Sequence, residues 1–248
     1  MDGFKFFERL SPEVAKAAAD EARRLGRSVI AHSVDIFSAV DAGYTSVEHS
    51  WAVMFTTIRD AKKKSEVDME RMTGKVGTVE AHTFMEPDLF DPIIKAMVEK
   101  DIHWSPAWAT QFRALSPRAP EMKKRELAML KNPRLRYLPA YNVESVEGYF
   151  GGFEKMTPEK RAQLTSAYQM VQDFARRYVA AGGKIHSGSD PGSLLPAYGV
   201  HAEFELMIDA GLNPLLAIQS ASLNVAHAWG KDKDYGSVEK AGALRKGK

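Results

Sequence analysis

Cysteine is absent from this chain of 248 residues, and its absence removes several kinds of site at once. Disulfide bonds, thiolate nucleophiles and cysteine-rich zinc sites are all excluded. Any metal site or acid–base chemistry must therefore use histidine, carboxylate or lysine side chains. The absence of cysteine does not indicate whether the protein resides in an oxidising or a reducing compartment.

Long apolar runs and an excess of one charge are also missing. No segment approaches the roughly 20 apolar residues that cross a bilayer. Residues 1–10 lack the basic region and apolar core of a signal peptide, so we expect no membrane contact and, by default, a cytoplasmic protein. The formal net charge is only +2 and the basic residues are scattered among acidic ones, so no nucleic-acid partner is expected.

The remaining composition is that of a globular protein, with 44% hydrophobic and 27% charged residues. It predicts one domain over residues 1–248 with a sizeable core. Within that domain, β-like runs and helical segments alternate. We expect strands over the following ranges: 4–7, 28–32, 44–49, 102–106 and 184–190. We expect helices over these ranges: 11–25, 35–42, 86–100, 157–181 and 213–229.

This alternation predicts an α/β protein with parallel βαβ units, interrupted by a helical insertion over about residues 109–153. Parallel sheets carry their working residues where strands end and loops begin. His32, His49 and Asp190 all lie at such ends. Period-two alternation predicts that each of them shares a sheet face with the residue two positions before it.

Two imidazoles and one carboxylate are a donor set that suits zinc and similar divalent ions. A single histidine at a strand end is more often a hydrogen-bonded structural residue than a ligand. Three such residues at equivalent strand ends favour a metal site. The other histidines in the strands and helices, His82, His103, His186 and His227, have no paired spacing, and we interpret them as structural.

Three motifs contain these residues: Ser-Val-Ile-Ala-His ends at His32, Tyr-Thr-Ser-Val-Glu-His-Ser contains His49, and Ser-Gly-Ser-Asp ends at Asp190. They resemble the fifth, sixth and eighth barrel strands of the amidohydrolase superfamily. The imidazolonepropionase-like and Xaa-Pro dipeptidase-like branch is the most similar, with further similarity in these segments: 201–206, 210–214, 221–226 and 235–239. The resemblance implies an incomplete TIM-like (β/α) barrel whose strands are equivalent to strands 4–8.

The resemblance also implies roles for individual residues. His32 and His49 would bind the second metal ion, and Asp190 would bind the first and shuttle a proton. Lys5 resembles the fourth-strand lysine that becomes a carbamate and bridges two metals. An unmodified ammonium group would repel a cation, so a solvated strand-end lysine is the alternative. His201 would contact substrate or hold the Asp190 loop, with a helix cap as its alternative.

The sequence departs from the family pattern in two ways. The family's first strand supplies a His-x-His pair to one metal, and no such pair occurs here. The chain also starts near the fourth strand and stops where the family returns to a β-sandwich, so we interpret both ends as cut. Three explanations remain open: the chain is a gene fragment, it is a naturally shortened enzyme, or it takes the missing strands from another chain. The expected cofactor is zinc, as one or two divalent ions, with a mononuclear site favoured.

The expected activity is hydrolysis of an amide bond, in a peptide or a cyclic amide, or of an ester bond, through a metal-activated water and a small-molecule substrate. The alternative is a non-catalytic truncated remnant or pseudoenzyme that self-associates into a homo-oligomer through exposed sheet edges. A metal-independent esterase is disfavoured, because the sequence has no Gly-x-Ser-x-Gly elbow.

Overall fold

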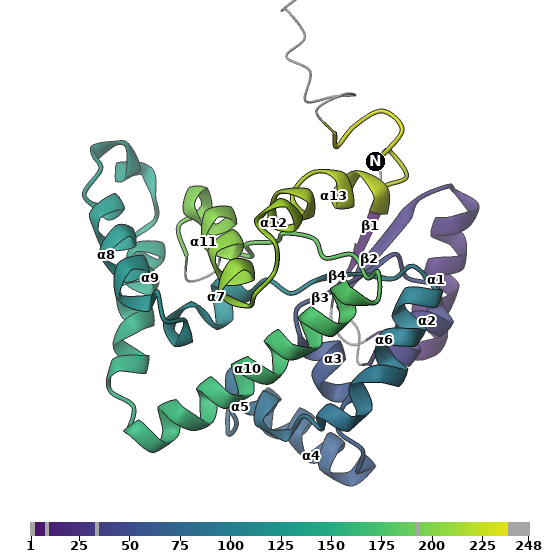
Figure 1. Ribbon diagram of the computed structural model, residues 1–248, viewed down its shortest axis with the longest axis horizontal. Helices are drawn as coiled ribbons and strands as arrows, with labels where there is room; N and C mark the ends of the chain where they lie inside the picture. The colour runs from purple at the N-terminus through teal and green to yellow at the C-terminus, as the bar shows by residue number, and fades with distance from the viewer. Residues whose placement is uncertain (1–2, 8–9, 33–34, 192–193, 238–248) are drawn as a thin grey trace, which may run out of the picture.

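A four-stranded parallel sheet forms the centre of the fold. The structure is a computed structural model and describes residues 3–7, 10–32, 35–191 and 194–237. The strands follow one another across the sheet in chain order: β1 (Gly3–Phe6), β2 (Ser28–Ala31), β3 (Ser46–Glu48) and β4 (His103–Ser105) (Figure 1). The α/β class with parallel strands is therefore confirmed. Within the described residues the sheet is open and does not close into a barrel.

The strand expected over residues 184–190 is reduced to a single parallel bridge between Trp104 and Ile185. This bridge still places the segment beside β4, on the side away from β3, so the segments continue to follow one another across the sheet in chain order. The expectation of a full strand is wrong, because residues 187–191 leave the ladder. The Ser187 amide donates instead to the Ser220 carbonyl, at 2.9 Å.

The two faces of the sheet differ in polarity. Paired residues of parallel strands share a face, and the pairing gives one wholly apolar row: Phe6, Ala31, Val47 and Trp104. The row one residue earlier carries a cation, a hydroxyl and an imidazole: Lys5, Ile30, Ser46 and His103. Successive side chains alternate between faces, so Glu48 and Ser105 lie on this second face too. We call it the polar face.

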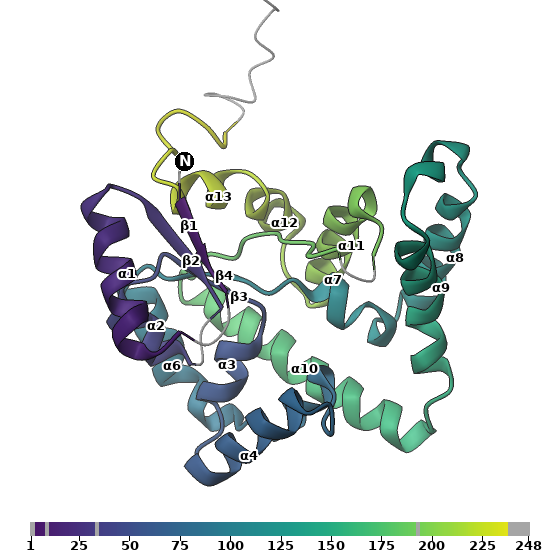
Figure 2. The same cartoon turned by 180° about the vertical axis from the view of Figure 1, so that it is seen from behind.

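A layer of helices covers the apolar face. The layer contains α1 (Pro12–Arg24), α2 (Ile36–Ala42), α6 (Phe90–Glu99) and α10 (Pro158–Ala180), and each contacts the next (Figures 1 and 2). Polar side chains cap the start of three of these helices: those of Ser11, Asp35 and Thr157 accept backbone N–H groups of the first turn. Buried alanines on α1 let it approach the sheet closely.

The remaining helices lie outside this layer. The segment expected to be a helical insertion contains α7 (Trp108–Gln111), α8 (Ala119–Leu130) and α9 (Ala140–Glu154). Residues 51–81 form α3 (Trp51–Thr56), α4 (Ala61–Met72) and α5 (Thr78–Ala81). After α11 (Pro196–Asp209), the helix expected over 213–229 is in fact two, α12 (Pro214–Ser220) and α13 (Leu223–Ala228). The backbone of Ser222, with φ −135° and ψ −88°, breaks it.

A buried ion pair anchors α8 to the rest of the protein. Arg113 and Glu126 are both 0% exposed, with Nε of the arginine 2.8 Å from Oε1 of the glutamate. The guanidinium also donates to the Ala109 carbonyl at 2.9 Å and lies 3.6 Å from the centre of the Tyr149 ring. The pair therefore ties α8 and α9 to α7. None of the described helices is both long and apolar enough to cross a membrane.

Candidate functional site

The carboxyl end of the sheet brings together three residues predicted from sequence. His32 directly follows β2, and its N–H donates to the Phe6 carbonyl at 3.1 Å. His49 directly follows β3, and its ring lies edge-on to that of His32, with 4.8 Å between ring centres. Asp190 completes the group, with Oδ2 3.5 Å from Nε2 of His49. We call these three residues the carboxyl-end cluster.

His49 is held by contacts on every side. Its backbone N–H donates to the Ser105 carbonyl at 2.6 Å, and its carbonyl accepts from Nε1 of Trp104 at 2.6 Å. Its ring stacks on Trp51 with 4.7 Å between centres. The side chain is 4% exposed, so its orientation is fixed by packing.

The protonation state of His49 suits a ligand or a base. Burial is the main reason that its pKa falls to about 4, and the neighbouring His32 lowers it further. The imidazole is therefore neutral at pH 7. Its Nδ1 and the Nε1 of Trp51 are buried atoms with no hydrogen-bond partner in the described part of the chain. Such atoms in a native fold indicate a ligand, an ion or water.

Backbone geometry corrects one prediction about this cluster. Strand β3 ends at Glu48, and His49 and Asp190 have positive φ angles of 60° and 36°. Positive φ takes a residue out of the extended region, so the period-two rule does not extend to either position. Val47 faces the helix layer while Glu48 lies on the polar face, and the expectation that Val47 shares a face with His49 is wrong.

Lys5 lies on the polar face in an ion pair with Glu48. Its Nζ is 3.7 Å from Oε2 of Glu48, and the lysine side chain is 53% exposed against 14% for the glutamate. Burial raises the pKa of Glu48, while Lys5 and a hydrogen bond from Ser105 oppose that shift. Sequence reasoning missed Glu48 as a site residue. Two features of the sequence could have indicated it: Glu48 directly precedes His49, and the residue two positions earlier on the same strand, Ser46, is also polar.

His201 has no described contact with Asp190. It lies exposed in the interior of α11, so the helix-cap alternative is wrong for this residue. Glu203, two residues later in α11, does cap a helix, because it lies at the start of α7. Its carboxylate accepts from the backbone N–H groups of Trp108 at 3.0 Å and Ala109 at 2.7 Å. Burial raises the pKa of Glu203 to about 8.

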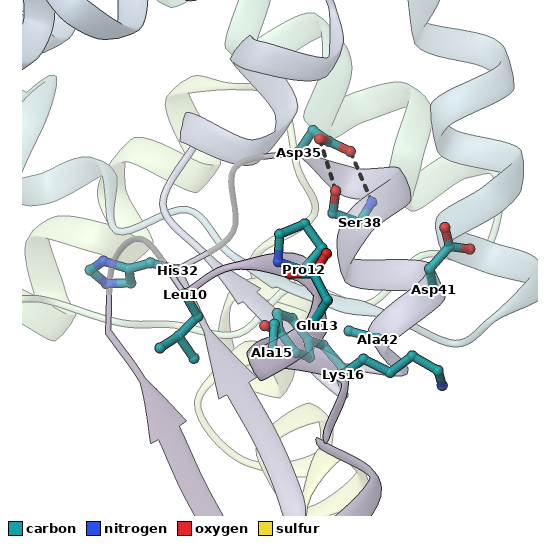
Figure 3. A pocket seen from close by; sticks show the side chains of 11 residues that line it. Leu10, Pro12, Glu13, Ala15, Lys16, His32, Asp35, Ser38, Asp41 and Ala42 are labelled. Atoms are coloured by element: carbon teal, nitrogen blue, oxygen red, sulfur yellow. Dashed lines mark hydrogen bonds between the residues drawn. The ribbon is translucent and has the colours of Figure 1, made fainter. Parts of the chain in front are cut away.

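Two cavities adjoin the carboxyl-end cluster. The first, of about 600 Å³, lies against α1 and α2 and has His32 at one end (Figure 3). The second, of about 430 Å³, is lined by Asp190 and by Trp51. Tyr149 and Phe153 of α9 also line it, which places aromatic side chains of the insertion next to the cluster.

Comparison with known proteins gives a likeness of structure only. No family model and no curated protein matches the sequence. A solved Xaa-Pro dipeptidase with bound methionine in its active site is 20% identical, with a TM-score of 0.54 over 96% of this chain and 46% of that chain. For bottromycin amidohydrolase the values are 17%, 0.59, 93% and 47%, and for A. niger ochratoxinase 18%, 0.51, 95% and 41%. The chain thus spans less than half the length of these structures, and over that length its fold is similar to theirs.

Proposed function

We propose that this protein is a metal-dependent hydrolase of amide bonds built on part of a TIM-like barrel, equivalent to strands 4–8. The observation that supports the proposal is the convergence of His32, His49 and Asp190 at the carboxyl ends of a parallel sheet. This is the end at which α/β folds hold their ligands. The fold shared with solved amidohydrolases supports amide substrates.

A divalent ion, with zinc as our first choice, would have to draw these side chains closer together, because the described residues whose ligand atoms all lie within 4.8 Å of one another do not include this cluster. The buried Nδ1 of His49 has no described partner, the imidazole is neutral, and two nitrogens with one carboxylate oxygen are ligands that zinc accepts. His32, His49 and Asp190 would hold the ion, and Lys5 would join them only as a carbamate. A bound ion would supply Lewis acidity toward a substrate carbonyl and toward water.

The chain's own residues would do the rest. Asp190 would take a proton and return it to the leaving group, because its carboxylate lies beside His49 and the residue lines the second cavity. Trp51 packs against His49 and keeps water from that side of the ring. Tyr149 and Phe153 offer an apolar surface to the side chain of a small-molecule substrate.

The test is metal content by elemental analysis, together with hydrolysis of dipeptides, cyclic amides and esters before and after chelation. We expect turnover of amides that chelator abolishes, and loss of that turnover and of one zinc equivalent per chain in His49→Asn and Asp190→Asn. The control is Lys95→Ala, which changes a side chain on α6 that is 74% exposed and lies outside the cluster. Metal-free protein without turnover, or turnover that survives chelation, would contradict the proposal. The first of these outcomes would support the non-catalytic alternative.

Lys5 is tested by a pair of substitutions. Lys5→Arg keeps the positive charge beside Glu48 but removes the amine that forms a carbamate. If Lys5 is a carbamate ligand, Lys5→Arg loses metal and added bicarbonate raises metal uptake of the unaltered protein only. Equal metal content in both proteins would mean that Lys5 is a solvated partner of Glu48.

A further inference from the structure

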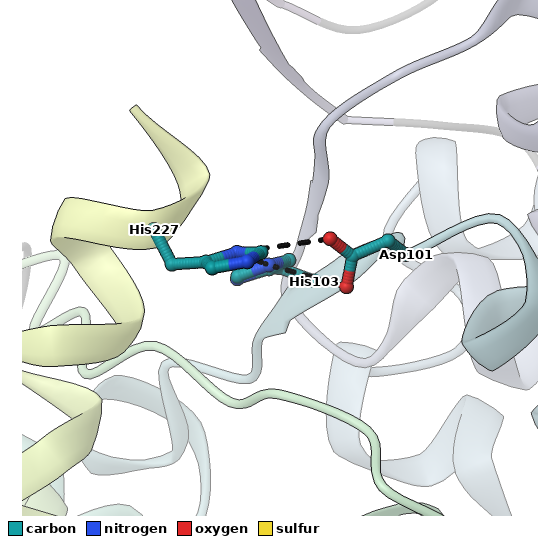
Figure 4. A group of neighbouring side chains, drawn as sticks. All are labelled: Asp101, His103 and His227. Atoms are coloured by element: carbon teal, nitrogen blue, oxygen red, sulfur yellow. Dashed lines mark hydrogen bonds and ion pairs between the residues drawn. The ribbon is translucent and has the colours of Figure 1, made fainter. Parts of the chain in front are cut away.

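A second group of possible ligands lies at the opposite, amino end of the sheet. Asp101 follows α6, His103 is the first residue of β4, and His227 lies in α13 (Figure 4). One ligand atom from each lies within 4.8 Å of the other two. We call these residues the amino-end cluster. Asp101 and His103 are two positions apart, and His227 comes from a segment 124 positions after His103.

The spacing of the atoms suits a first-row metal. Nε2 of His103 is 3.1 Å from Nδ1 of His227. The Asp101 carboxylate lies 3.7 Å from each, through Oδ1 for His103 and through Oδ2 for His227. Tetrahedral zinc with bonds of about 2.0–2.1 Å places neighbouring ligand atoms roughly 3.3 Å apart. The observed distances bracket that value, so small side-chain movements would complete the geometry.

The surroundings of His103 resemble those of a metal ligand. Its other ring nitrogen, Nδ1, is 2.7 Å from Nε2 of His186, and such outer partners fix the orientation of a ligating imidazole. The side chain of His103 is 1% exposed, whereas those of Asp101 and His227 are 54% and 37% exposed. An ion can therefore reach the cluster from solvent while one ligand stays rigid.

One neighbouring charge competes with a metal. The Lys184 ammonium forms an ion pair with Asp101 and offsets the negative charge that would attract a cation. Lys184 is 32% exposed, so it can swing away into water. Removing its charge should therefore strengthen metal binding.

We propose that Asp101, His103 and His227 form a second divalent-metal site, structural in role and distinct from the carboxyl-end cluster. The ion would link α13 to β4 and α6. The hydrogen bonds of α13 with the sheet region include those from Ser28 to the Ala228 carbonyl at 2.7 Å and from Asn224 to the Ile185 carbonyl at 2.8 Å, besides the contact between His103 and His227. The site does not depend on the proposed hydrolase activity.

The experiment is titration of the metal-free protein with Co²⁺, followed by visible absorption, which reports tetrahedral coordination. It is done in the His49→Asn background to remove the other cluster. We expect one equivalent of Co²⁺ in this background, lost in His49→Asn/His227→Ala and retained in the control His49→Asn/His201→Ala. Both histidines are on helices and outside the core, so these variants should fold, and far-ultraviolet circular dichroism checks that they do.

Two further variants sharpen the result. Asp101→Asn should weaken binding by more than the roughly 10- to 100-fold typical of losing an outer partner, and Lys184→Gln should strengthen it. Equal Co²⁺ uptake with and without His227, or no uptake in the His49→Asn background, would overturn the proposal. Neither result would bear on the hydrolase, because the carboxyl-end cluster is tested separately by chelator-sensitive turnover.

Discussion

Breaking the buried Arg113–Glu126 pair should destabilise the protein by several kilocalories per mole. Glu126→Leu leaves a guanidinium that is 0% exposed without its carboxylate. Removing one partner of such a pair costs about 3–5 kcal/mol. The arginine keeps its hydrogen bond to Ala109 and its position over Tyr149, and a desolvated cation–π contact is worth about 2 kcal/mol. We therefore expect the lower end of the range, about 3 kcal/mol.

The measurement is urea denaturation followed by circular dichroism, with Glu126→Leu, Arg113→Met and the double variant forming a cycle. The double variant should regain most of the loss, because apolar replacements of a buried pair are often neutral or better. The control is Lys123→Ala, which removes the exposed ion pair of Lys123 with Glu154 in the same region and should cost less than about 1 kcal/mol. A loss below about 1 kcal/mol in Glu126→Leu would refute the reasoning, since the pair could not then be desolvated.

Two further predictions concern pH. Burial lowers the pKa of His82 to about 4, so the unfolded chain takes up the proton first as the pH falls from 6.5, and stability declines down to pH 4. His82→Asn should remove about 2 kcal/mol of the loss between pH 7 and pH 5 in urea titrations, and an unchanged loss would count against it. The raised pKa of Glu203 has the opposite effect on the pH dependence of stability. The unfolded chain releases this proton first, so stability should fall as the pH rises from 5 to 8. Glu203→Gln should abolish that slope and cost about 1–3 kcal/mol, and a variant that keeps the slope would show that another group carries it.

Local sequence signals predicted much of the fold. Ser11, Asp35 and Thr157 each precede a helix that begins where their side chains can cap it, and the alternation of segments predicted the parallel strands that the sheet contains. Capping and periodicity act over a few residues, so a single sequence reports them well. The break at Ser222 was missed because nothing in its neighbours forbids helix.

The sites were predicted less completely. His32, His49 and Asp190 were found because each ends a β-like run, and the structure brings them together. The contact of His103 with His227 joins residues 124 positions apart and depends on how α13 meets the amino end of β4. No spacing rule reports such a contact, and we therefore interpreted both residues as structural.

The residues with positive φ have a consequence for evolution of this chain. In the described part, the non-glycine residues with this geometry are His49, Asp101, Ala107 and Asp190. Three of these four belong to the two clusters. Glycine would adopt the same backbone at lower cost, so a library selected for thermal resistance alone should drift toward glycine at positions 49, 101 and 190. Selection that also demands ligand binding should hold histidine and aspartate there, and the difference between the two outcomes would separate the demands of folding from those of chemistry.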